Sequence, residues 1–228
     1  MLFSGGKDST FALWCATHQA HDVACLLTMV PERRDSWMFH HPAVEWTGLQ
    51  ANALGFPLVT AKTSGVKEEE LTALRRSLSK LVTSVGIECV VTGAIASEYQ
   101  RSRIDRICDE LGIRAIAPLW GKSPKDLLRE EIDMRFEFVL TACMAMGLNQ
   151  SWLGRLIDKD ALEELEIISQ RHGINLAFEG GEAETFVTDA PIFSNRIRIV
   201  EAERIWEGDS GYLRIVRAEL DEKARKSV

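Results

Sequence analysis

The sequence predicts an α/β fold in which a parallel β-sheet carries helices on both faces and is followed by a smaller α+β region. Two observations lead to this fold class. From residue 3 to about residue 118, short apolar runs alternate with amphipathic stretches, as in repeated strand–helix units around a parallel sheet. After residue 121 that rhythm ends. We therefore expect one domain over residues 1–121 and a second over residues 122–228.

The strands expected in the first region are brief, continuous and apolar, as strands covered on both faces should be. They comprise residues 2–3, 23–30, 57–61, 89–92 and 114–117. Residues 10–16 form an apolar helical stretch directly after the first strand. Between residues 68 and 82, leucines recur every three or four positions, which predicts an amphipathic helix with one buried stripe. These leucines are Leu71, Leu74, Leu78 and Leu81.

The second region mixes helices with strands whose apolar and polar residues partly alternate, which is typical of a sheet with one more exposed face. Helices are expected near residues 124–132 and 160–171. Strands are expected at residues 136–140, 175–178, 186–188, 197–202 and 212–217. The mostly charged residues 221–228 are expected to fray.

Composition excludes several classes of protein. With 228 residues, 46% hydrophobic and 27% charged, the chain is neither collagen-like nor wholly disordered. No apolar run approaches the roughly 20 residues of a membrane-spanning helix, and the start lacks the features of a secretory signal, so we expect a cytoplasmic protein without membrane contact. The five widely spaced cysteines are expected to be reduced core residues. A net charge of −7 argues against stable nucleic-acid binding.

A glycine-rich loop follows the first strand and precedes a helix, which is where an anion-binding loop belongs. It reads Ser4-Gly5-Gly6-Lys7-Asp8-Ser9. Glycines allow a tight turn that exposes backbone amides, Lys7 supplies a positive charge, and the Ser4 and Ser9 hydroxyls add donors. Asp8 repels phosphate, so its expected use is to hold Mg²⁺. The spacing fits neither GxxxxGK[ST] nor GxGxxG. The alternative is an ordinary solvated turn.

SGGKDS resembles the loop of the N-type ATP pyrophosphatases, which cut ATP between its α and β phosphates. The resemblance implies a Rossmann-like fold of the adenine nucleotide alpha hydrolase-like type. It also implies ATP as substrate, Lys7 and Asp8 as catalytic residues and Asp8 as the metal ligand. It does not identify the acceptor.

The rest of the chain resembles the diphthine–ammonia ligases over nearly its whole length. The matching stretches are Ser36-Trp37-Met38-Phe39-His40 with Leu49-Gln50-Ala51, Thr92-Gly93-Ala94-Ile95-Ala96-Ser97 with Tyr99-Gln100-Arg101 and Arg103, Pro118-Leu119-Trp120-Gly121, Ser151-Trp152-Leu153-Gly154-Arg155, and Glu179-Gly180-Gly181-Glu182-Ala183-Glu184-Thr185-Phe186. Three positions depart from the family pattern: Ala43 in place of asparagine, Phe178 in place of glycine and Ala183 in place of an aromatic residue.

The resemblance implies an AMP-forming ligase that converts diphthine on translation elongation factor 2 to diphthamide with ammonium and ATP. The residues expected to bind ATP are Ser4, Gly5, Gly6, Lys7, Asp8, Ser9, His40 and Gly93. Those expected to bind the acceptor are Ser97, Tyr99, Gln100, Arg103, Glu179, Gly180, Gly181, Glu182 and Glu184. His40 is also a candidate to take a proton from ammonium. Trp120, Trp152 and Phe186 are candidate aromatic faces for the trimethylammonium group of diphthine.

Several alternatives stay open on the sequence alone. The arginines around Arg103 could form a solvated helix face. The acidic loop, Glu179–Glu184, could be a solvated turn or a metal site. The chain could instead be a tRNA-modifying ATP pyrophosphatase or a non-catalytic nucleotide-binding module. Free ammonia is the expected donor because the two regions leave no room for an amidotransferase domain. A homodimer is a further possible assembly.

Overall fold

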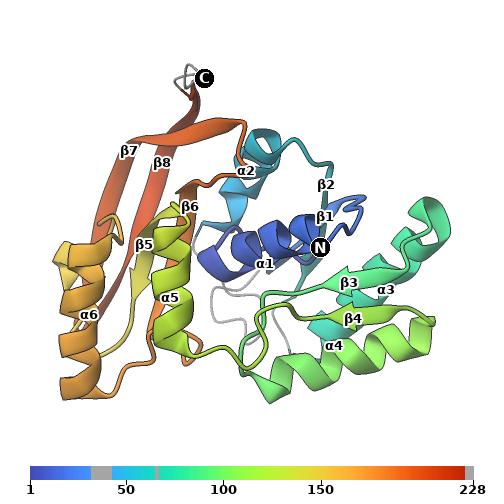
Figure 1. The fold of residues 1–228 in the computed structure, drawn as a ribbon, viewed down its shortest axis with the longest axis horizontal. Helices are drawn as coiled ribbons and strands as arrows, with labels where there is room; N and C mark the ends of the chain where they lie inside the picture. The colour runs from blue at the N-terminus through green and yellow to red at the C-terminus, as the bar shows by residue number, and fades with distance from the viewer. Residues whose placement is uncertain (32–42, 65–66, 224–228) are drawn as a thin grey trace.

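The computed structural model of the chain describes residues 1–31, 43–64 and 67–223, and Figure 1 shows the arrangement of its elements. The helices are α1 Lys7–His18, α2 Thr47–Leu54, α3 Lys67–Val85, α4 Glu98–Leu111, α5 Pro124–Asp133 and α6 Lys159–His172, with short 3₁₀ turns η1 Val44–Trp46 and η2 Gln150–Trp152. The strands are β1 Leu26–Pro31, β2 Leu58–Thr63, β3 Cys89–Val91, β4 Arg114–Ile116, β5 Glu137–Cys143, β6 Ala183–Asp189, β7 Asn195–Glu207 and β8 Ser210–Glu222.

The N-terminal segment Leu2–Phe3 lies at the centre of a parallel layer. β1 pairs with β2 on one side, and β3 pairs with β4 on the other, both in parallel. The Leu2 amide donates to the Val91 carbonyl at 2.9 Å, and the Phe3 amide donates to the Leu27 carbonyl at 2.9 Å. The chain therefore returns to one side of Leu2–Phe3 and then to the other, which is the switch point where open α/β sheets bind ligands.

Helices cover both faces of this parallel layer, which confirms the predicted α/β class. Leu27 and Val90 pack with Leu74 of α3 and Ile104 of α4 in one buried cluster. The neighbouring residues Leu26 and Val91 point to the opposite face of the layer. There they belong to a second buried cluster, which contains Phe11 and Leu13 of α1. This alternation along the strands is expected because successive side chains of a strand point to opposite faces.

The second layer is an antiparallel sheet in the order β6-β5-β8-β7. Helices α5 and α6 pack on it, and α1 lies between the two sheets (Figure 1). Phe11 of α1, Leu127 of α5, Phe138 of β5 and Phe186 of β6 are all 0% exposed and belong to one cluster. The buried core is therefore continuous across residue 121, and the division into domains at 121/122 stays a prediction.

The strand predicted at residues 175–178 is wrong, because these residues form a turn. The Asn175 side-chain oxygen accepts from the Ala177 amide at 2.8 Å, and the Asn175 carbonyl accepts from the Phe178 amide at 2.9 Å. Phe178 has a φ of +63°, which no strand residue adopts. The local hydrogen bonds of asparagine outweigh the strand-like composition, and the apolar side chains are buried by the turn instead.

The ends of most strands differ from the predicted ranges by a few residues. β1 starts at Leu26 rather than Val23, where the Leu26 amide first finds its parallel partner, the Pro57 carbonyl, at 2.8 Å. β8 continues to Glu222 because β7 pairs with it along its length, so Asp221 and Glu222 belong to the sheet. No helix among the described residues is long and apolar enough to cross a bilayer.

Candidate functional site

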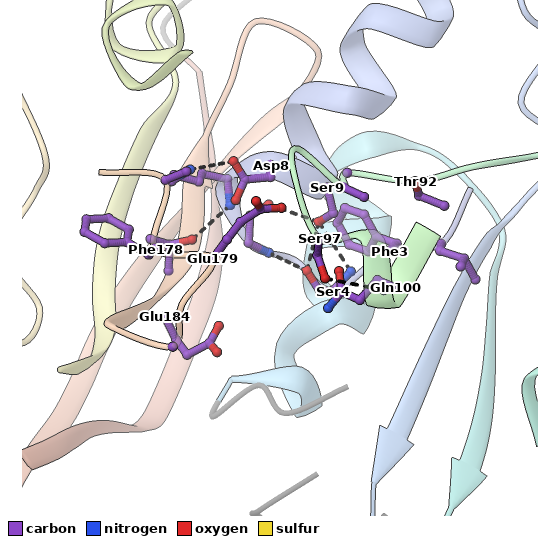
Figure 2. A pocket seen from close by; sticks show the side chains of 18 of the residues that line it. Phe3, Ser4, Asp8, Ser9, Thr92, Ser97, Gln100, Phe178, Glu179 and Glu184 are labelled. Carbon is purple, nitrogen blue, oxygen red and sulfur yellow. Dashed lines mark hydrogen bonds and ion pairs between the residues drawn. The ribbon is translucent and has the colours of Figure 1, made fainter. Parts of the chain in front are cut away.

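A cavity of about 850 Å³ opens beyond the carboxyl ends of Leu2–Phe3 and β3 and is bounded on the other side by the chain entering β6. Figure 2 shows side chains from both sheets directed around it. Most of the residues predicted to bind ATP or the acceptor line this cavity. They are Ser4, Gly6, Lys7, Asp8, Ser9, Gly93, Ser97, Gln100, Glu179, Gly180, Gly181 and Glu184.

Four predicted residues do not line the cavity, and His40 lies outside the described residues. Gly5 lies on the side of the loop away from the cavity, against Gln50. Glu182 braces its own turn, because its two carboxylate oxygens accept from the Asn175 amide at 3.0 Å and the Gly180 amide at 2.8 Å. Tyr99 and Arg103 contact each other on α4, with the Arg103 guanidinium 3.5 Å from the centre of the Tyr99 ring.

The aromatic candidates from the sequence also lie elsewhere. Trp152 and Phe186 are buried in the core, and Trp120 stacks with Arg101 at 4.2 Å from its ring centre. Phe178 lines the cavity in their place. The family pattern has glycine at this position, and the φ of +63° explains that preference, since glycine adopts this conformation without strain.

The phosphate-type loop is held from behind by the Gly5 carbonyl, which accepts two hydrogen bonds. The donors are the Gln50 side-chain amide at 2.8 Å and the Val187 backbone amide at 3.1 Å. The same Gln50 nitrogen also donates to the Val187 carbonyl at 2.9 Å. Gly5 has a φ of +82°, and a Cβ there would lie 2.0 Å from the Gln50 side-chain oxygen. Only glycine therefore fits between the loop and this clamp.

Residues of the loop make the polar contacts at the start of α1, the helix that follows it. The Lys7 amide donates to the Thr185 hydroxyl of β6 at 3.0 Å, and the Ser9 hydroxyl donates to the Gly6 carbonyl at 3.0 Å. The first turn of a helix leaves backbone amides outside the helical ladder, which makes it a place for an anion. Gly93 packs against this turn so closely that a Cβ there would lie 2.8 Å from the Ser9 nitrogen.

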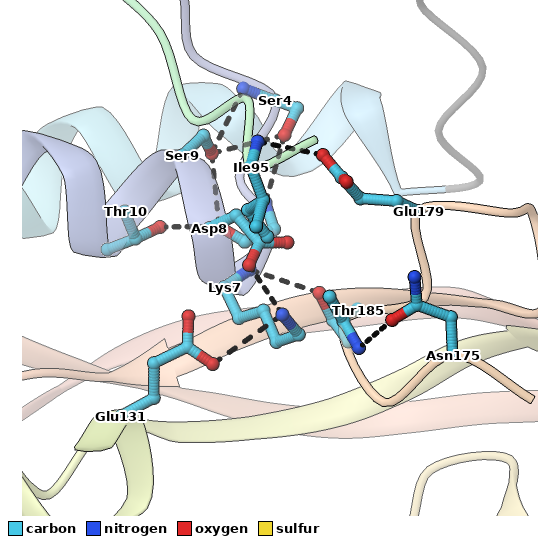
Figure 3. A network of polar contacts seen from close by, with 12 residues as sticks. Ser4, Lys7, Asp8, Ser9, Thr10, Ile95, Glu131, Asn175, Glu179 and Thr185 are labelled. Atoms are coloured by element: carbon cyan, nitrogen blue, oxygen red, sulfur yellow. Dashed lines mark hydrogen bonds and ion pairs between the residues drawn. The ribbon is translucent and has the colours of Figure 1, made fainter. Parts of the chain in front are cut away.

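Lys7 lies between two carboxylates from different parts of the chain (Figure 3). Its ammonium is 2.5 Å from the Asp8 Oδ1 and 3.6 Å from the Glu131 Oε2 of α5. Lys7 is 1% exposed and Glu131 is 0% exposed. The Phe178 ring centre lies 5.9 Å from the same ammonium. The lysine of the loop is thus a buried, paired cation rather than a solvated one.

Burial and pairing move the pKa values of this trio. Burial raises the pKa of Glu131 to about 8, although Lys7 opposes the shift. Burial also raises the pKa of the Asp8 carboxyl against the same lysine. Burial would lower the pKa of the Lys7 ammonium, but Asp8 and Glu131 outweigh it and raise that pKa. Lys7 therefore stays charged, and a proton shared within the trio resides on a carboxyl group.

Glu179 joins the acidic loop to the parallel layer. Its carboxylate oxygens accept from the backbone amides of Ile95 and Ala96, each at 2.8 Å (Figure 3). Burial nevertheless raises its pKa. Glu184 lines the same cavity from the start of β6, so three carboxylates, those of Asp8, Glu179 and Glu184, border it.

A divalent cation fits Asp8 only together with a ligand that brings further oxygens. Among the described residues, no group of three or more histidine, cysteine or acidic side chains is arranged to hold a metal ion. Mg²⁺ bound with a nucleotide typically uses one or two carboxylates, phosphate oxygens and waters. Asp8, where the loop runs into the first turn of α1, matches that kind of site.

Four residues that the sequence analysis did not assign contribute to this arrangement: Gln50, Glu131, Phe178 and Thr185. Gln50 and Thr185 lie inside stretches that resemble the family, and that resemblance could have pointed to them as site residues. Glu131 lies on an ordinary amphipathic helix, where a glutamate is expected to be solvated. Nothing in the sequence marks it as buried.

The fold and loop define an α/β protein that presents a phosphate-binding type of loop at the switch point of a parallel sheet. Two family models match the chain: the diphthamide synthase N-terminal domain over residues 1–115 and the diphthamide synthase C-terminal domain over residues 123–220. The chain belongs to the diphthamide synthase family.

Curated relatives carry the name diphthine–ammonia ligase. The mouse protein is 29% identical over 246 residues, which cover 97% of this chain and 92% of the relative. The human protein is 28% identical, with 97% and 92% covered. The Schizosaccharomyces pombe protein is 30% identical, and the match covers 94% of this chain but 38% of that longer protein. A crystal structure described as a predicted subunit of tRNA methyltransferase from Methanocaldococcus jannaschii matches with 17% identity and a TM-score of 0.44, covering 83% of this chain and 95% of the other.

Alanine substitution of two glycines tests the clamp on the loop. Gly5 and Gly55 share a positive φ, but a Cβ at Gly55 would meet nothing within 4 Å. We expect Gly55→Ala to lower the free energy of unfolding by about 1 kcal/mol through backbone strain alone. Gly5→Ala should lower it by about 3 kcal/mol, because the clash with Gln50 adds to that strain. Urea denaturation measures the free energy of unfolding of both variants. Equal losses would contradict the close contact between Gly5 and Gln50.

The buried Glu131 predicts a pH dependence of stability. Its pKa is raised from 4.5 to about 8, so between these values the folded chain holds a proton that the unfolded chain has released. The free energy of unfolding should therefore fall as the pH rises from about 4.5 to about 8. Asp8 acts in the same direction. Glu131→Gln should flatten part of this slope in urea denaturation across the window, and an unchanged slope would contradict the assignment.

Proposed function

We propose that this chain amidates diphthine on translation elongation factor 2, using ATP and ammonium and releasing AMP and pyrophosphate. The observation that carries the proposal is that one cavity is bordered both by the Ser4–Ser9 loop and by the Glu179–Glu184 loop. A nucleotide and an acceptor bound on these two loops would meet within it. Membership of the diphthamide synthase family and the name of the relatives support this choice of acceptor.

In this proposal the triphosphate of ATP lies on the loop and the first turn of α1. The backbone amides of that turn and the Lys7 ammonium face its oxygens. Gly93 allows the start of α1 to lie directly against the chain beyond β3, because a side chain there would enter that turn. Ser97 and Gln100, at the start of α4, border the other side of the cavity and would contact the adenosine part.

The charges that line the cavity make a divalent cation necessary. Among the described lining residues, Lys7 is the cation, and Asp8, Glu179 and Glu184 are acidic. Such a surface repels a multiply charged anion unless a counter-ion is present. We assign Mg²⁺ to Asp8, where it would neutralise phosphate charge when bound. Lys7 then turns its hydrogen bonds from Asp8 to the phosphate oxygens.

The acceptor enters from the side of the acidic loop. Glu184 and the Phe178 ring border the cavity there, and a carboxylate and an aromatic face suit a quaternary ammonium group. The diphthine carboxylate attacks the α phosphorus of ATP, the bond from that phosphorus to the bridging oxygen breaks, and pyrophosphate leaves. Ammonia, formed when ammonium loses a proton, then attacks the acyl carbon, and AMP leaves as the amide forms.

The protein's contribution is orientation and stabilisation of charge. The loop is fixed by the Gln50 clamp and by Thr185, so its amides are in place before the reaction starts. Preorganised donors of this kind commonly supply a large part of the rate enhancement. We place the reaction in the cytoplasm, with the elongation factor as a folded protein partner, and the homodimer stays a prediction from the sequence.

Removal of the loop lysine tests the proposal. The chain is incubated with ATP, Mg²⁺, ammonium and elongation factor 2 that bears diphthine, and AMP and the carboxyl-to-amide mass change are measured. Lys7→Met should lower AMP formation by about 100- to 1000-fold, because one charged donor to the developing phosphate charge is lost. Chelation of Mg²⁺ should abolish AMP formation with the unchanged protein.

The matched control is Lys159→Met, which removes an exposed lysine paired with Asp133 at 2.7 Å and should leave the rate unchanged. Formation of ADP instead of AMP would contradict cleavage next to the α phosphate. ATP binding without any AMP, with diphthine present, would indicate a nucleotide-binding module instead of a ligase.

A further inference from the structure

Glu131 is a fully buried carboxylate that faces the phosphate-type loop from the second half of the chain. It is 0% exposed, and its Oε2 lies 3.6 Å from the Lys7 ammonium. In the part of the chain that the structure describes, neither of its oxygens has a hydrogen-bond partner. A buried carboxyl group with so few partners costs stability, so a role beyond packing is needed to account for it.

The helix that carries Glu131 is firmly held. Ser123 precedes α5 and its hydroxyl caps the helix by accepting from the Asp126 amide, and Leu127 is 0% exposed in the core. On the outer side, Lys125 and Arg129 both pair with Glu166 of α6, at 2.7 and 3.1 Å. Glu131 therefore presents its oxygens from a fixed position, whereas Asp8 is part of the loop that receives the ligand.

Lys7 has two carboxyl partners in this structure, and the proposed reaction takes one of them away. When Asp8 binds a divalent cation, its Oδ1 no longer pairs with the Lys7 ammonium. An uncoordinated lysine side chain has many rotamers, and ordering it costs free energy. Glu131 is the partner that remains, because it lies on the side of Lys7 formed by α5 rather than by the loop (Figure 3).

We propose that Glu131 is a positioning residue for Lys7: its side-chain oxygen holds the ammonium in place while Asp8 binds the metal and the triphosphate occupies the loop. This inference rests on the proposed function for the roles of Lys7 and Asp8. It adds a residue from α5 to a site built otherwise from the loop, the start of α4 and the acidic loop.

Glu131 offers an acceptor oxygen to Lys7 in either protonation state. Burial raises the pKa of its carboxyl group to about 8, against the opposing effect of Lys7. A protonated carboxyl still offers its carbonyl oxygen to an ammonium donor. Glutamine offers an equivalent oxygen in the same volume, whereas methionine removes the oxygens and keeps the length of the side chain.

The test compares three variants by AMP formation with diphthine-bearing elongation factor and by the dissociation constant of ATP with Mg²⁺ in calorimetry. Glu131→Met should lower AMP formation on the order of 100-fold, because a small displacement of a charge-stabilising group has effects of that size. Glu131→Gln should stay within about tenfold of the unchanged protein, because its side-chain oxygen takes the place of the Glu131 oxygen beside the Lys7 ammonium. Glu131→Asp, which withdraws the oxygen by one methylene, should lie between them.

A double-mutant cycle shows whether Glu131 acts through Lys7. Glu131→Met should weaken ATP binding about tenfold in the unchanged protein and not at all in the Lys7→Met background, because the group that it positions is absent there. An equal loss in both backgrounds would overturn the proposal and indicate a general structural role. Unchanged AMP formation in both Glu131→Met and Glu131→Asp would also overturn it.

The neighbouring Glu130 provides the control. Its side chain is 40% exposed and pairs with Lys122 at 2.5 Å, so Glu130→Met should change neither ATP binding nor AMP formation. Thermal unfolding reports whether each variant is folded, and Glu131→Asp keeps the proposal testable if Glu131→Met does not fold. If Lys7→Met itself leaves AMP formation intact, the proposed function fails. If Lys7→Met abolishes it while the Glu131 variants do not alter it, only this inference fails.

Discussion

The hydrogen bond from the Val187 amide to the Gly5 carbonyl joins the phosphate-type loop to the second sheet, and the rest of the site depends on it. β6 is an edge strand, so its outer amides need partners that no strand of its own sheet supplies. The loop supplies one for Val187, and Gln50 closes the contact by bonding to both Gly5 and Val187. The loop that would hold a triphosphate is therefore completed by Gln50 of α2 and by β6, which lies in the second half of the chain.

This connection also explains how two loops of different sequence come to border one cavity. Thr185, which accepts from the Lys7 amide, lies next to Glu184, which borders the cavity. Glu179, at the other end of the acidic loop, accepts from backbone amides just beyond β3. Both ends of the acidic loop are thus tied to the parallel layer. These few polar contacts fix the position of the acidic loop relative to the Ser4–Ser9 loop.

The sequence predicts those features that depend on local pattern. Continuous apolar strands and the glycine-rich loop after the first of them predict the parallel layer and place the loop at its switch point, and both the fold class and the family are confirmed. The turn at Asn175 was missed because an asparagine side chain competes with strand pairing over a few atoms. Glu131 was missed because its burial depends on α5 packing over Lys7, a contact between residues distant in the sequence. Phe178, a departure from the family pattern, lines the cavity together with Phe3.

Amide hydrogen exchange followed by NMR on the ligand-free chain tests the central claim most directly. The account predicts that the amide of Val187, bonded to Gly5, and the amide of Lys7, bonded to Thr185, exchange as slowly as the core amides of β5. Exchange of both at the rate of the exposed turn at Gly208 would mean that the loop is not held by β6. In that case the second half of the chain does not complete the site.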